Sequence, residues 1–196
     1  MDVKDITGDT RLFSLGIGFA ISHLQSFIDR SMPSSKLKFV GQEPVHVGKG
    51  QFIVIGTPEP NRIAKFFFNI LSEEYVLPFE IYTNTNQKRI EIKHGNNTYF
   101  GELDNDKNGK DYSLVVKFQH NGQWIILIMA SLTHGSFEGA RSITNPRIIQ
   151  EVLKVTKKAD CFAFIIKTRV FENKSLGPEL ELNSITMFKL KQQSST

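Results

Sequence analysis

The sequence has little cysteine, little tryptophan and no long apolar run, and each scarcity excludes a class of protein. Cys161 is the only cysteine among 196 residues, so no intramolecular disulfide can form, as is usual in a reducing compartment. The longest helix-like stretch, residues 12–28, contains His23 and Gln25 and is too polar to span a bilayer. Residues 1–9 are acidic and polar, unlike a secretory signal. We therefore expect a cytoplasmic protein without a membrane segment.

Several motifs that identify common enzymes are also absent. The sequence contains no Gly-x-Gly-x-x-Gly, Gly-Lys-Ser/Thr, Gly-x-Ser-x-Gly or His-Glu-x-x-His pattern, and no pair of cysteines. We therefore expect neither a cofactor nor a metal site. The formal net charge is +4, from 24 basic and 20 acidic residues, and the basic residues are scattered. Without a dense basic stripe this excess does not favour a nucleic-acid partner.

What is present is a set of strands and helices that alternate along the chain. Residues 52–55, 124–130 and 161–166 are continuous apolar runs, which are typical of strands buried on both faces. Residues 12–28 and 63–71 have apolar side chains at spacings of three and four, which predicts helices.

Between these strands lie segments that alternate in polarity and are separated by polar turns, which predicts hairpins. Asn121-Gly122 is a strong signal for one of these hairpin turns. The sequence predicts one α/β domain over residues 1–196, with a mixed, mostly parallel central sheet. The hairpins are expected at one edge and helices on both faces. Residues 1–35 are expected to contribute an N-terminal helix that packs on this domain or on a partner, and helix 12–28 is a candidate dimer contact.

The first candidate site is the turn from Gly56 to Asn61, between strand 52–55 and the following helix. Such turns lie at the carboxyl ends of strands, where ligands bind in open α/β sheets. Two prolines remove backbone donors from this turn and Glu59 adds a negative charge, so a phosphate cradle is not expected. Either the turn only caps the helix, or its polar side chains contact a ligand. The candidate ligand residues are Thr57, Glu59, Asn61 and Arg62.

The second candidate site follows strand 124–130, where polar residues appear directly after an apolar run. Its candidate ligand residues are Ser131, Thr133, His134 and Gly135. His134 could serve as a general base, a hydrogen-bonding ligand contact or a structural cap, and Ser136 could in principle be a nucleophile. No other histidine lies at a metal-ligand spacing from His134. These roles remain open from the sequence.

The order of these motifs resembles a small α/β domain of bacterial and archaeal regulatory or conflict-type proteins. The matching segments are Ile53–Pro58 with Asn61, Tyr112–Val116, Ile126–Leu132 with His134-Gly135, and Ala140-Arg141. The resemblance covers about residues 50–171 and implies a ligand sensor in signalling or prokaryotic defence. Thr57 and Ser131 stand where that pattern has glycine.

The leading functional hypothesis is therefore a non-catalytic sensor or regulatory domain. It would bind a small polar, nucleotide-like ligand between the two turns, at the carboxyl ends of two strands. One alternative is a hydrolase or transferase that uses His134 as general base, with Glu59 or Ser136 nearby. The other alternative is a protein-interaction scaffold that uses helix 12–28.

Overall fold

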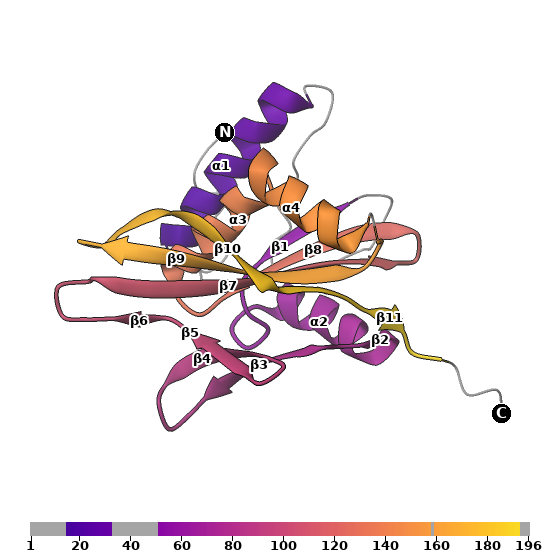
Figure 1. Cartoon of the computed structure of the whole chain (residues 1–196), viewed down its shortest axis with the longest axis horizontal. Helices are drawn as coiled ribbons and strands as arrows, with labels where there is room; N and C mark the ends of the chain where they lie inside the picture. Colours follow the sequence, from indigo (N-terminus) through magenta and orange to yellow (C-terminus); the bar gives the residue numbers. More distant parts are fainter. Residues whose placement is uncertain (1–14, 33–50, 158, 193–196) are drawn as a thin grey trace.

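The computed structural model describes residues 15–32, 51–157 and 159–192. Its four helices and its strands form layers, with a twisted sheet in the middle (Figure 1). The helices are α1 (Leu15–Ser31), α2 (Arg62–Glu74), α3 (Thr133–Ser142) and α4 (Pro146–Thr156). The predicted helices over 12–28 and 63–71 are thus present, although residues 12–14 of the first lie outside the described part. Of the predicted N-terminal segment 1–35, only residues 15–32 are described.

The main sheet has the strand order β1-β8-β7-β9-β10, and β6 pairs with β7. Its strands are β1 (Phe52–Ile55), β6 (Glu102–Leu103), β7 (Gly109–His120), β8 (Gln123–Ala130), β9 (Phe162–Phe171) and β10 (Lys174–Met187). The sequence placed β1 and the start of β8 and β9 within a residue of their observed bounds. Continuous apolar runs explain this agreement, because both faces of these strands are covered.

The prediction of a mostly parallel sheet is wrong. Among the described strands only β1 and β8 pair in parallel, whereas β7 pairs antiparallel with both β8 and β9. The Asn121-Gly122 turn folds β7 back against β8, with positive φ at both residues as such turns require. Strand β7, which was predicted to lie in a hairpin at the sheet edge, is therefore a central strand between β8 and β9. The mixed α/β character is confirmed, but antiparallel pairing dominates.

The sheet buries side chains on both faces, and helices cover both, as predicted. Helices α1, α3 and α4 lie above the sheet in Figure 1, and α2 lies below it. On the α2 side, Phe67 and Leu71 are fully buried in the largest apolar cluster, with Leu127 of β8. On the other side, α4 packs Ile148 and Val152 against β7 and β9. The even and odd residues of each central strand thus serve two separate cores.

Two smaller sheets extend the α2 side. One consists of β3 (Phe79–Asn84), β4 (Arg89–His94) and β5 (Asn97–Phe100), all antiparallel. The other pairs β2 (Tyr75–Val76) with β11 (Lys189–Leu190). Phe79 and Ile92 are buried in the large cluster, so the β3–β5 sheet is anchored to the main sheet by its apolar face. The polar end of the β3–β4 hairpin is left at the surface.

Helix α1 packs on the domain itself, against α3. Its buried residues are Gly16, Ala20, Leu24 and Ile28, which recur every four positions. A side chain at Gly16 would lie 1.9 Å from the backbone oxygen of Thr133, so glycine lets the two helices approach closely. Leu15 is 78% exposed and Phe19 is 58% exposed. Self-association through this helix stays a prediction.

Candidate functional site

The two predicted turns lie side by side at one edge of the main sheet. Strands β1 and β8 are parallel neighbours, with Ile55 opposite Ile128. The Gly56 amide continues their pairing by donating to the Ile128 carbonyl at 2.9 Å. Both turns therefore start from the same strand ends, which is the arrangement that favours ligand sites in such sheets.

A shallow, open depression of about 430 Å³ lies where these turns meet the β3–β4 hairpin. Three segments of the chain line it. The residues are Glu59 and Pro60 of the first turn, Thr83, Lys88, Arg89 and Ile90 of the hairpin, and Ser131 and Leu132 of the second turn. The structure thus brings together only two of the eight predicted ligand residues, Glu59 and Ser131.

The remaining candidates in the first turn have other roles. Asn61 is the N-cap of α2, and its Oδ1 accepts from the amides of Ile63 and Ala64 at 3.0 Å each. Its Nδ2 donates to the Ile55 carbonyl at 3.1 Å, which ties the cap to the end of β1. Thr57 is 7% exposed, and Arg62 begins α2 with an exposed side chain. Neither of these two lines the depression.

The second turn is held by Asp111 of β7, a fully buried residue. Its Oδ1 accepts from the amides of Tyr112 and Leu132 at 2.7 and 2.9 Å, and its Oδ2 accepts from Gly135 at 2.5 Å. Leu132, the N-cap residue of α3, makes no side-chain cap bond. Asp111 therefore caps α3 from the neighbouring strand, with its negative charge at the positive end of the helix dipole.

Burial raises the pKa of Asp111 to about 6. Removing the carboxylate from water disfavours its charged form. The three amide donors and the nearby His134 favour that form and offset only part of the effect. Because the Gly135 amide is taken by Asp111, this amide is not free for a ligand. A side chain at Gly135 would lie 2.7 Å from the Tyr112 carbonyl oxygen, so the close approach requires glycine.

His134 and Thr133 face other parts of the molecule. The His134 Nε2 lies 3.1 Å from the carbonyl oxygen of Asn173, in the turn between β9 and β10. Because a carbonyl only accepts, Nε2 carries the proton in this contact. Within the described residues, the His134 Nδ1 is buried without a hydrogen-bond partner. Thr133 packs its backbone against α1 at Gly16.

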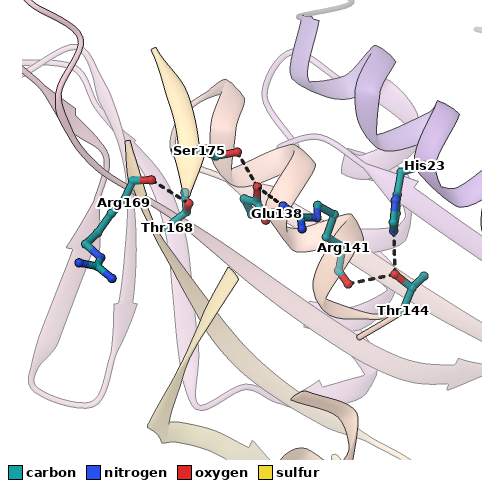
Figure 2. A network of polar contacts seen from close by, with 7 residues as sticks. All are labelled: His23, Glu138, Arg141, Thr144, Thr168, Arg169 and Ser175. Carbon is teal, nitrogen blue, oxygen red and sulfur yellow. Dashed lines mark hydrogen bonds and ion pairs between the residues drawn. The ribbon is translucent and has the colours of Figure 1, made fainter. Parts of the chain in front are cut away.

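Further along α3, a second polar face fixes the helix to its neighbours (Figure 2). The fully buried Glu138 accepts from Ser175 of β10 at 2.5 Å and pairs with Arg141 at 3.0 Å. The His23 ring of α1 reaches the Thr144 hydroxyl at 2.7 Å. Ser136, the alternative nucleophile, is 7% exposed on the same helix. These contacts join α3 to neighbouring elements, and none of these side chains lines the depression.

The hairpin side of the depression contains a second buried carboxylate, Glu91. It accepts from the Tyr82 hydroxyl at 2.8 Å, from Asn84 Nδ2 at 2.9 Å and from Arg89 Nε at 2.8 Å. The hydrogen bond from Arg89 and then that from Tyr82 hold the pKa of Glu91 below its usual value, against the effect of burial. The Arg89 guanidinium carbon lies 3.4 Å from the centre of the Phe100 ring. Arg89 is thus fixed by an ion pair and by stacking.

Other kinds of site find little support in the described residues. No group of three or more His, Cys, Asp or Glu side chains there has the arrangement of a metal site. None of the described helices is both long and apolar enough to cross a membrane. The chain matches no protein-family model, no curated protein and no solved structure. The candidate site therefore rests on its own geometry, and the family resemblance stays a prediction.

Sequence reasoning missed the residues that the hairpin contributes, and it missed Asp111. Lys88 ends a polar turn and Arg89 begins a half-exposed strand, and charged residues are commonplace in both settings. Asp111 does carry a signal, because a carboxylate immediately before the apolar run 112–118 is costly to bury without donors. Two of its three amide partners, Leu132 and Gly135, lie more than twenty residues away in the chain, so the sequence does not identify them.

Proposed function

We propose that this protein is a non-catalytic sensor domain that binds a small polar ligand in the depression between the two turns. The observation that carries the proposal is the Ser131 hydroxyl. Ser131 is 6% exposed and lines the depression, and its hydroxyl is buried just beneath that surface without a hydrogen-bond partner among the described residues. Since a buried hydroxyl without a partner costs free energy, a bound ligand that accepts or donates here would remove that cost.

The position of the depression supports the same proposal. It lies at the carboxyl ends of β1 and β8, which pair in parallel in the main sheet. Its charged side chains come from separate segments of the chain, as in ligand sites assembled on a rigid fold. The Glu59 carboxylate accepts from the Thr83 hydroxyl, which ties the first turn to the hairpin. Ligand binding would therefore be coupled to the position of the β3–β4 hairpin relative to the main sheet.

The hydrolase or transferase alternative finds no specific support in the geometry. In the described residues, no hydrogen bond joins His134 to Ser136 or to Glu59, and the Nε2 of His134 is engaged with Asn173. Since a general base needs an accessible nitrogen within reach of the proton it removes, we do not advance this alternative further. We also do not advance the scaffold alternative, because α1 uses its apolar face within its own chain.

The test compares ligand retention by two serine variants. Ser131 and Ser136 are both buried near the start of α3, but only Ser131 lines the depression. We expect native mass spectrometry of the wild-type protein, equilibrated with the small-molecule fraction of a cell extract, to show a bound molecule. Ser131→Ala should lose that molecule with little change in stability, because no hydrogen bond within the protein is removed.

Ser136→Ala is the matched control and should retain the bound molecule. If the wild-type protein carries no molecule from the extract, the proposed function is wrong. If Ser136→Ala loses the molecule and Ser131→Ala keeps it, the binding site lies on the α3 side and not in the depression.

A further inference from the structure

We infer that the depression recognises an oxyanion of its ligand, a phosphate or a carboxylate, through the guanidinium of Arg89. This inference rests on the proposed function and specifies the chemistry of the ligand. It depends on how Arg89 is held, on which of its nitrogens remain free, and on the charges around it.

Arg89 is held in place before any ligand arrives. Its Nε donates to Glu91, and the flat guanidinium stacks on Phe100. Glu91 is itself fixed by Tyr82 and Asn84, so the chain of contacts extends across the hairpin. A side chain fixed in this way loses little conformational freedom on binding, which favours affinity.

The two terminal nitrogens of Arg89 are the part left for a ligand. Within the described residues, neither of them takes part in a hydrogen bond, while the side chain is 28% exposed. A planar guanidinium with its Nε occupied and its terminal nitrogens free presents parallel N–H donors. Carboxylates and phosphates match this spacing with two hydrogen bonds, and water or a neutral amide does so less well.

The neighbouring residues define the two ends of the ligand. Lys88 is exposed beside Arg89 and makes no ion pair with a described residue, so it adds positive charge at the same place. Glu59 lines the depression and is held by Thr83, and its carboxylate would repel an oxyanion. A ligand with the oxyanion at Arg89 and a hydrogen-bond donor toward Glu59 satisfies both groups. Ser131 can serve either part, because a hydroxyl both donates and accepts.

The test is a titration of the folded protein with inorganic phosphate and, separately, with succinate, followed by amide chemical shifts. We expect one of these anions to shift the amides of Lys88, Arg89 and Ser131. Arg89→Gln should weaken that binding at least about tenfold, because it removes charge-assisted hydrogen bonds. Arg147→Gln is the matched control, since Arg147 is exposed on α4 and does not line the depression. The response to phosphate or to succinate identifies the source of the oxyanion.

A second variant, Arg89→Lys, keeps the charge but loses the forked donors and the stacking plane. It should bind more weakly than wild type and more tightly than Arg89→Gln, which separates recognition from a folding defect.

If neither anion shifts these amides, while an extract molecule still binds and Arg89→Gln retains it, the oxyanion inference is wrong and the proposed function stands. If an anion binds equally to wild type and Arg89→Gln, the inference is also wrong. If no extract molecule binds to the wild-type protein, it is the proposed function that fails.

Discussion

At the scale of single residues, two buried carboxylates organise this edge of the molecule, and their pKa values are shifted in opposite directions. Glu91 lies among an arginine and neutral donors, so its pKa is lowered. Asp111 lies among backbone amides in a water-free environment, so its pKa is raised to about 6. One carboxylate fixes the hairpin and the other fixes the second turn. Both therefore act on the depression without lining it.

The raised pKa of Asp111 makes the stability of the fold depend on pH. Its ordinary value is 3.8, so between that pH and about 6 the folded state binds more protons at Asp111 than the unfolded state. Asp111 therefore contributes a stability that is full at lower pH and is lost as the pH rises through about 6. The shift corresponds to ~3 kcal/mol.

Asp111→Asn tests this dependence. The amide nitrogen that replaces Oδ2 would face the Gly135 amide, so the variant loses that hydrogen bond and is less stable at pH 5. It also no longer titrates, so the free-energy difference from wild type should shrink by up to ~3 kcal/mol between pH 4 and pH 7. Urea unfolding of both proteins across this range measures the difference. A difference that stays constant with pH would contradict the assignment.

At the scale of elements, α1 and α3 form the closest helix contact. Substitutions at two glycines of α1, Gly16 and Gly18, separate the effect of this packing on stability from the effect of helix propensity. Gly16→Ala places a methyl group 1.9 Å from the Thr133 backbone oxygen, so the helices must separate. We expect a loss of about 1–3 kcal/mol in the free energy of unfolding. Gly18 has no atom within 4 Å of an added Cβ, so Gly18→Ala should stabilise the protein by about 0.5–1 kcal/mol. Equal effects of the two changes in chemical denaturation would show that α1 does not pack as described.

The sequence predicts elements well where a local pattern determines them. The apolar runs locate β1 and β8, and the apolar spacing over residues 63–71 locates α2. The sequence does not predict the order of the strands in the sheet. Nothing in the local pattern of residues 109–120 says that β7 lies between β8 and β9, because that placement depends on long-range pairing. The same limit hides Arg89, whose importance comes from its contacts with Glu91 and Phe100.

At the scale of the whole molecule, the two faces of the main sheet differ in the elements that cover them. On one face, α1, α3 and α4 pack closely and use their polar residues for contacts between elements, as Figure 2 shows for Glu138. On the other face, the β3–β5 sheet leaves a polar hairpin end beside the two turns. Glu59 and Ser131, two of the predicted ligand residues, line the same depression, and their role in binding stays a proposal. Residues of the β3–β4 hairpin line this depression, and His134 does not.

An amide chemical-shift map of the protein, with and without the molecule that it retains from an extract, tests most directly whether that molecule binds in the depression. We predict that the largest shifts fall on Thr83, Lys88, Ile90 and Ser131, which line the depression. Small shifts are expected at His134 and Asn173, which do not line the depression. A map whose largest shifts surround His134, Ser136 and Asn173, with none on the hairpin, would contradict the account.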